Sequence, residues 1–283
     1  MISHASLSRR GALRATAAGV VAAASTSGTS TAQAQATNKM TYVLVPPAWH
    51  GGWCWKKVKP LLQEGGHDVY TPTLTGLGER SHLAHQEIGL DIHIHDIVNV
   101  LKYEDLSGVI LVGHSSSGMV ITGVADRVPE LLSHLVYIDA FVPEDGQSMW
   151  DIIPPDRRPA MEALVKTEGN GWLLPRFAAL PWEKFVPEVW RVTDEADLRW
   201  MLARLGPTPF GHFKELVRRK NPAAERLPRT YIRCTLYPHA GFDRYAETAR
   251  RSAGWRYREL ASYHHPAITN PRELADLLLE IAS

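Results

Sequence analysis

The sequence predicts an α/β fold built on a doubly wound, mainly parallel sheet, and three observations lead there. Short β-branched runs alternate with stretches of helical apolar spacing. Most of those runs are apolar on both faces, as strands buried in a parallel sheet are. The chain has 283 residues, 45% of them hydrophobic and 22% charged, which are the proportions of a globular protein with a sizeable core.

The expected strands and helices follow one another along the chain in βα order. The strands are 41–45, 67–70, 108–112, 135–138, 230–233 and 255–260. The helices between and after them are 53–63, 90–101, 119–128, 242–251 and 271–281. The last helix begins with Asn270 as its N-cap and Pro271 in its first turn, which is a favourable start for a helix.

One stretch, residues 147–221, interrupts this alternation. It contains no convincing strand, and it is too long for a plain loop between two sheet strands. We expect a helical cap over the strand ends, where open α/β sheets bind ligands, although an inert helical subdomain is the alternative. Aromatic residues are interleaved there with charges and prolines: Trp150, Trp172, Phe177, Trp182, Phe185, Trp190, Trp200, Phe210 and Phe213.

The first 36 residues are predicted to be an export signal of the twin-arginine type. Residues 1–36 contain Arg9, Arg10 and Arg14 and no acidic residue, then a small apolar stretch and an Ala-x-Ala ending. Ala12 stands where an aromatic residue is usual in such signals. A disordered tail and an ordinary secretory signal are the alternatives, whereas the apolar stretch is too short for a membrane anchor. The expected location is therefore periplasmic or secreted.

Charge and composition limit the kinds of partner that the protein is expected to bind. The 31 Lys and Arg residues nearly balance the 30 Asp and Glu residues, and the sequence shows no basic stripe of the kind that binds nucleic acid. There is no phosphate-cradling glycine loop and no cluster with metal-ligand spacing, so we expect neither cofactor nor metal. Cys54 and Cys234 are expected to be small buried apolar residues. A small molecule is the expected partner, and the oligomeric state is left open.

The strongest chemical signal surrounds Ser115. A buried strand runs into Gly113-His114-Ser115-Ser116-Ser117-Gly118 and then into a helix. Small residues around a serine at such a strand-to-helix turn are what a strained nucleophile elbow needs. Ser117 occupies the fifth motif position, where glycine is usual, and Gly118 follows it. Ser115 is the candidate nucleophile.

A nucleophilic serine also needs a base and an oxyanion hole. His264 lies between the last strand and the last helix, where the base is expected, and His265 is the fallback. The oxyanion donors should be the N–H after the nucleophile, that of Ser116, and one in the turn after the first strand. Pro46 and Pro47 have no N–H, so Ala48 is the first residue of that turn able to donate.

Segments 43–55, 74–80, 113–120, 137–143 and 264–271 together resemble the α/β-hydrolase superfamily. The resemblance is to the branch with plant methylesterases, hydroxynitrile lyases and bacterial pyrethroid-type carboxylesterases, and it covers about residues 40–283. It implies an α/β-hydrolase domain over residues 37–283, with the helical cap inserted at 147–221. The family usually has His-Gly where this chain has Pro46-Pro47.

The resemblance leaves the acid of the triad open. In plant members an Asp follows the strand that corresponds to 231–235, but Tyr237 occupies that place here. The hydrolase fold offers a second place for the acid, at the end of the strand after the nucleophile helix, as in some haloalkane dehalogenases. Asp139 stands there, and Asp243 remains the alternative.

These residues favour a serine carboxylesterase that cleaves small, mainly apolar aryl or alkyl esters through an acyl-enzyme. Hydroxynitrile lyase, or hydrolysis of lactones, amides or C–C bonds, is the alternative. In the lyases that the chain resembles, a Lys follows the catalytic His, and His265 stands there instead. A non-catalytic ligand receptor is disfavoured by the intact pair of Ser115 and His264.

Overall fold

The structure is a computed structural model that describes residues 39–177 and 180–282. The described residues belong to one compact unit. The predicted export signal, residues 1–36, lies outside the described residues.

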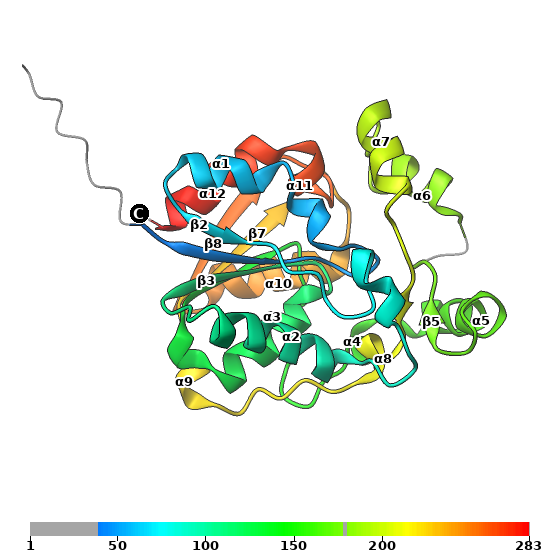
Figure 1. Cartoon of the computed structure of the whole chain (residues 1–283), viewed down its shortest axis with the longest axis horizontal. Coiled ribbons are helices and arrows are strands. Elements are labelled where there is room, and N and C mark those ends of the chain that lie inside the picture. Colours follow the sequence, from blue (N-terminus) through cyan, green and yellow to red (C-terminus); the bar gives the residue numbers. More distant parts are fainter. Residues whose placement is uncertain (1–38, 178–179, 283) are drawn as a thin grey trace, which may run out of the picture. The chain divides into compact units, whose positions relative to one another are not determined.

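A six-stranded parallel sheet forms the centre of this unit, with the strand order β2-β1-β3-β4-β7-β8 (Figure 1). All six strands expected from the sequence are confirmed, with ends that differ by at most three residues. They are β1 Thr41–Val45, β2 Asp68–Tyr70, β3 Val109–His114, β4 Leu132–Ile138, β7 Arg229–Cys234 and β8 Trp255–Leu260.

Helices cover both faces of the sheet. Outside residues 147–221 the α-helices are α1 Val58–Glu64, α2 Leu90–Tyr103, α3 Ser117–Arg127, α9 Pro222–Glu225, α10 Ala240–Arg251, α11 Pro266–Thr269 and α12 Pro271–Ala282. Short 3-10 helices are Gly52–Trp55, Gly78–Leu83 and Pro129–Leu131.

Alternating strand residues form the two halves of the core, because successive side chains of a strand point to opposite faces. Val112 belongs to the apolar cluster that includes α1 and α12. Its neighbour Leu111 belongs to the cluster that includes α2, α3 and α10. Figure 1 shows α1 and α12 above the sheet and α2 and α3 below it. The central strands β1, β3 and β4 are therefore buried on both faces, which is why their sequences are mainly apolar, whereas the edge strand β8 carries exposed charges.

The strand register brings the ends of β3 and β4 level and places Ile232 of β7 beside them. His114 pairs with Ile138, and Ile138 pairs with Ile232 on its other side. The next residues along these strands, Ser115 and Asp139, therefore meet at the carboxyl edge of the sheet. The backbone completes this edge, since the Ser115 N–H donates to Ile138 O at 3.1 Å.

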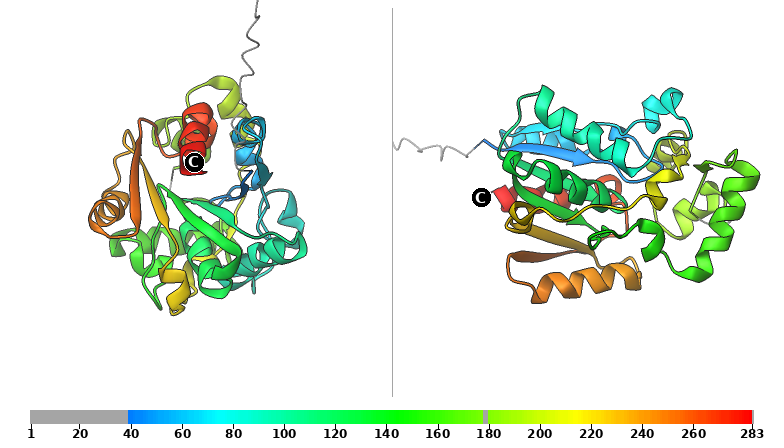
Figure 2. Two further views of the ribbon diagram at one scale, coloured as in Figure 1. Left: turned by 90° about the vertical axis from the view of Figure 1, so that its left-hand side faces the viewer. Right: turned by 90° about the horizontal axis from the view of Figure 1, so that it is seen from below.

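Residues 147–221, called the insertion below, fold mainly as short helices beyond the carboxyl ends of the strands (Figure 2). These helices are α4 Met149–Ile152, the 3-10 helix Pro155–Arg157, α5 Arg158–Glu168, α6 Trp182–Glu188, α7 Glu195–Leu202 and α8 Gly211–Lys214. The expectation that the insertion lacks strands is wrong. Strand β5 (Leu173–Leu174) pairs antiparallel with β6 (Thr208–Pro209), and two-residue strands are too short to show a period-two pattern.

Two further observations concern the described residues. Cys54 and Cys234 are buried and unpaired, as expected. Across 39–177 and 180–282, no helix has the length and apolar character needed to cross a bilayer.

Candidate active site

Ser115 sits at a sharp turn between β3 and α3. Its φ of +55° is in the left-handed region, which non-glycine residues seldom adopt. The turn tolerates only small neighbours: a Cβ added at Gly118 would lie 1.9 Å from the carbonyl oxygen of Phe141, and one at Gly113 would lie 2.9 Å from that of Ser117. The glycines that flank the serine are thus required by close backbone approach.

Ser117, which stands where glycine is usual, has a specific contact. Its hydroxyl donates a hydrogen bond to the carbonyl oxygen of Pro46. Pro46 belongs to the turn in which this chain departs from the family pattern of His-Gly. The two departures therefore touch, and the hydroxyl of Ser117 ties the nucleophile turn to the turn after β1.

His264 reaches Ser115 from the loop after β8. The Ser115 hydroxyl lies 3.0 Å from His264 Nε2, and His264 Nδ1 lies 3.1 Å from Asp139 Oδ2. Because a carboxylate only accepts hydrogen bonds, Nδ1 carries the proton and Nε2 is free to accept from Ser115. The structure thus brings together Ser115, His264 and Asp139, in the order that a nucleophile, a base and an orienting acid require.

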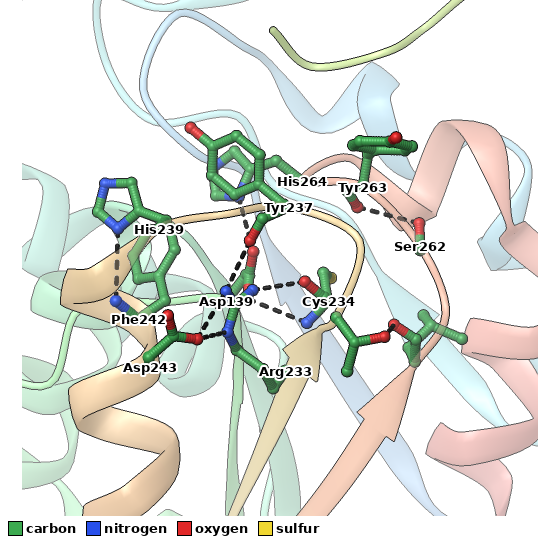
Figure 3. Close-up of polar contacts among 12 residues, drawn as sticks. Asp139, Arg233, Cys234, Tyr237, His239, Phe242, Asp243, Ser262, Tyr263 and His264 are labelled. Atoms are coloured by element: carbon green, nitrogen blue, oxygen red, sulfur yellow. Dashed lines mark hydrogen bonds and ion pairs between the residues drawn. The ribbon is translucent and has the colours of Figure 1, made fainter.

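Asp139, at the end of β4, is completely buried. Its second oxygen, Oδ1, accepts from Arg233 Nη1 at 2.8 Å and from the Cys234 N–H at 3.0 Å. Asp243, the alternative acid, lies on α10 and binds Arg233 Nε at 2.9 Å (Figure 3). Within the described residues Asp243 makes no bond to His264. Of the two candidates, only Asp139 contacts the imidazole.

The electrostatics of the pair follow from burial. Burial raises the pKa of Asp139 to about 7, although the nearby Arg233 guanidinium opposes the rise. Burial also lowers the pKa of His264 well below its usual value, and the charges of His239 and Arg233 lower it further. At neutral pH the imidazole is therefore neutral, which is the form that can accept a proton from Ser115.

The expected oxyanion donors lie side by side. The Ala48 N–H donates to Ser116 Oγ at 2.8 Å. The N–H of Ser116, at the start of α3, has no partner within the described residues. Trp49, which follows Ala48, has a φ of +67°. Its backbone N–H donates to Thr208 Oγ1 in β6, and its indole N–H donates to Leu174 O in β5. The short strands of the insertion thus hold the turn that carries Ala48.

His265, the fallback base, is buried beside the site, but it does not reach Ser115. Its ring packs edge-on against Trp190 and stacks with His50. Its Nε2 has no hydrogen-bond partner within the described residues. His265 is thus a wall residue of the pocket, and of the two histidines only His264 contacts the Ser115 hydroxyl in the described structure.

Two residues that contact the proposed acid and base, Arg233 and Tyr237, were not predicted from the sequence. Tyr237 stacks on His264 with ring centroids 4.8 Å apart. Arg233 is a charged residue next to the end of β7, a strand that is buried along its length, and its side chain is only 5% exposed. A charge at an expected core position is a signal for a buried ion pair, because unpaired charges are seldom buried.

A pocket lies over Ser115 and His264. Of the nine aromatic residues expected in the cap, Phe177 and Trp190 line it, while others pack against one another, such as Trp150 on Phe210. The remaining lining is Pro47, Ala48, Trp49, His50, Ser115, Ser116, Phe141, Met149, Tyr237, His239, Phe242, His264 and His265. This wall is mainly apolar and aromatic. No cluster of three or more His, Cys, Asp or Glu residues suited to a metal ion occurs in the described part of the chain.

Comparisons with known proteins show the family to which the chain belongs. A model of the "Alpha/beta hydrolase family" matches residues 42–277. A carbendazim hydrolyzing esterase from Nocardioides sp. (strain SG-4G) is 35% identical over 238 residues, which is 84% of this chain and 97% of that protein. Methylesterase 3 of Arabidopsis thaliana is 27% identical over 271 residues, 87% of this chain and 97% of that protein.

A solved structure is also similar. It is an extracellular α/β-hydrolase from a Paenibacillus species, described as sharing structural and functional homology with tobacco salicylic acid binding protein 2. The TM-score is 0.73 at 25% identity, and the match covers 85% of this chain and 98% of the other.

Proposed function

This chain belongs to the α/β-hydrolase family and is a carboxylic ester hydrolase, and on that premise we propose that Ser115, His264 and Asp139 carry out the reaction through an acyl-enzyme. One observation carries the proposal. Ser115 Oγ, His264 Nε2, His264 Nδ1 and Asp139 Oδ2 form a continuous chain of hydrogen bonds at 3.0 and 3.1 Å.

In the first half of the reaction, Ser115 Oγ attacks the ester carbonyl while His264 Nε2 takes its proton. The carbonyl oxygen becomes an oxyanion, which the N–H groups of Ala48 and Ser116 stabilise. For this, the Ala48 N–H exchanges its bond to Ser116 Oγ for one to the oxyanion. His264 then gives the proton to the leaving alcohol, and the acyl group remains on Ser115.

In the second half, His264 takes a proton from water, and the resulting hydroxide attacks the acyl-enzyme. The tetrahedral intermediate collapses, the carboxylic acid leaves, and Ser115 recovers its proton from His264. Asp139 keeps Nδ1 protonated throughout and stabilises the imidazolium that forms at each step.

The pocket favours small, mainly apolar ester substrates. Phe141, Met149, Phe177, Trp190 and Phe242 supply apolar surface beside Ser115, with His and Tyr rings around them. Aryl and alkyl esters fit such a wall. Because one relative is a carbendazim hydrolyzing esterase, carbendazim belongs in the substrate panel beside nitrophenyl and pyrethroid-type esters.

The test is release of nitrophenol from p-nitrophenyl acetate and butyrate by residues 37–283. Ser115→Ala should lose turnover by several orders of magnitude, because nothing replaces the nucleophile. Ser133→Ala is the matched control, since it removes another serine hydroxyl, which binds Gly108 O away from the pocket. Retention of most activity by Ser115→Ala, or an equal loss in Ser133→Ala, would refute the proposed nucleophile.

We also propose that residues 1–36 direct export as a twin-arginine-type signal, on the strength of Arg9 and Arg10 and the absence of acidic residues. The full chain, expressed in a bacterium with this pathway, should appear in the periplasm or medium in a shortened form. Arg9→Lys together with Arg10→Lys should retain it in the cytoplasm. Unchanged export of that variant would point to an ordinary secretory signal.

A further inference from the structure

We propose that Arg233 is a positioning residue for the reaction: its guanidinium holds Asp139 ionised and directed at His264 by binding the carboxylate oxygen that His264 leaves free. The inference rests on the proposed function. It assigns a role to a residue that does not contact Ser115 and is not among the residues that line the pocket over it in the described structure.

Every N–H group of the Arg233 guanidinium has a hydrogen-bond or ion-pair partner. Its Nη1 donates to Asp139 Oδ1 at 2.8 Å and also to the Cys234 carbonyl oxygen. Its Nη2 donates to the Tyr237 carbonyl oxygen at 2.6 Å and lies 2.8 Å from Asp243 Oδ1, while its Nε donates to the same Asp243 oxygen. A guanidinium has five N–H donors in a rigid planar arrangement, and these contacts occupy all five.

The contacts of Asp139 divide its two oxygens between two tasks. Oδ2 accepts from His264 Nδ1, and Oδ1 accepts from Arg233 and from the Cys234 N–H. With Oδ1 anchored by two donors, the carboxylate cannot rotate without losing both bonds. The remaining oxygen is therefore kept on the line to His264.

Charge is the second part of the role. Asp139 is completely buried, and burial disfavours an ionised carboxyl. The titratable and charged groups around Asp139 and Arg233 come from several elements: Tyr231, Cys234 and Tyr237 from β7 and its loop, His239, Asp243, Glu247 and Arg250 from α10 and its N-cap, Tyr257 and Glu259 from β8, Arg157 from the insertion, and His264. Arg250 pairs with Glu247 and Glu259 rather than with Asp139. Arg233 is the permanent cation that contacts Asp139, so it is the group that offsets burial.

Arg233 also supports the opposite side of the base. By binding the carbonyl oxygen of Tyr237 it holds the loop whose ring stacks on His264. Tyr237 stands where plant members of the family carry the acid. In this chain the same loop thus supplies a ring for His264, while the carboxylate comes from β4 and is fixed by a cation from β7.

The experiment compares pH profiles of kcat/KM for Arg233→Met and Arg233→Lys with the parent. Loss of the cation should move the midpoint of the acidic limb upward by about one pH unit or more. Activity of Arg233→Met should then fall about tenfold at pH 6.5 and recover to within about threefold of the parent at pH 9.5. Arg233→Lys, which restores the charge, should return the midpoint toward that of the parent.

Arg229→Met is the matched control. Arg229 lies on the same strand, is also buried, and pairs with Glu225 rather than Asp139. Its replacement should lower the melting temperature without moving the acidic limb. If Arg233→Met does not fold, Arg233→Gln carries the same test, because it keeps an amide donor for Asp139 but no charge.

A uniform loss at every pH with an unchanged midpoint would overturn the inference, since it would mean that Arg233 serves only the fold. So would an unchanged profile. Ser115→Ala in the same series separates the two hypotheses. If Ser115→Ala is active, the proposed function fails, whereas an inactive Ser115→Ala beside an unmoved midpoint in Arg233→Met refutes the role of Arg233 alone.

Discussion

Replacing Asp139 by Asn tests the assignment of the acid most sharply, because the change keeps the shape of the side chain and removes its charge. Oδ1 of Asp139 accepts two hydrogen bonds, from Arg233 and from the Cys234 N–H. An amide NH2 in the place of Oδ1 would face two donors, so the amide oxygen of the introduced asparagine occupies that place instead. The NH2 group is then turned toward His264 Nδ1.

This orientation forces the wrong tautomer on the base. An NH2 donor requires Nδ1 of His264 to accept, so the proton moves to Nε2, which faces Ser115 at 3.0 Å. That nitrogen can no longer take the proton of the hydroxyl. Amide substitution of a triad acid by this mechanism lowers kcat by about 10⁴, which is about 5.4 kcal/mol of transition-state stabilisation.

The assay is kcat for p-nitrophenyl butyrate at pH 8, with a melting curve for each variant. Asp243→Asn is the control, because Asp243 binds the same Arg233 but does not contact His264. It should stay within about threefold of the parent, since its side chain is 62% exposed and its pairing with Arg233 is screened by water. A folded Asp139→Asn with activity near that of the parent, beside a large loss in Asp243→Asn, would reverse the assignment.

Two further predictions follow from the same geometry. Gly118→Ala should lower the free energy of unfolding by about 2 kcal/mol or more, because the new Cβ would lie 1.9 Å from Phe141 O. Chemical denaturation measures this change, and Gly206→Ala is the control, because nothing lies within 4 Å of a Cβ at that position. The rate should rise with pH through about 7, because the pKa of Asp139 is raised to about 7 and only its ionised form orients the already neutral His264. A pH profile of kcat/KM with its acidic limb near pH 4 would contradict this.

The sequence alone was sufficient for the parts of the site that depend on local structure. A buried strand, a turn of small residues and a helix identify Ser115 without knowledge of any other segment. The place of His264, between the last strand and the last helix, follows from the βα order. The central strands β1, β3 and β4 were also readable, because strands buried on both faces are mainly apolar runs.

Other features depended on contacts across the chain and were not readable from local patterns. Two-residue strands such as β5 have no periodicity to detect, yet their contacts with Trp49 hold the turn that carries Ala48. The role of Ser117 was likewise hidden, because its partner Pro46 lies 71 residues away in the chain.

The choice between the two candidate acids shows most clearly what the sequence determines and what the tertiary structure adds. The sequence favours Asp139, which directly follows a strand, but leaves Asp243 as the alternative, because a few residues of loop could bring it back to the strand ends. Which of them contacts His264 depends on the tertiary structure, because β4 lies between β3 and β7 in the sheet. That order sets Asp139 beside Ser115 on one side and Arg233 on the other, whereas Asp243, on a helix of the outer layer, reaches only the far side of the guanidinium. Sequence determines which residues can do the chemistry, and strand order determines which of them meet.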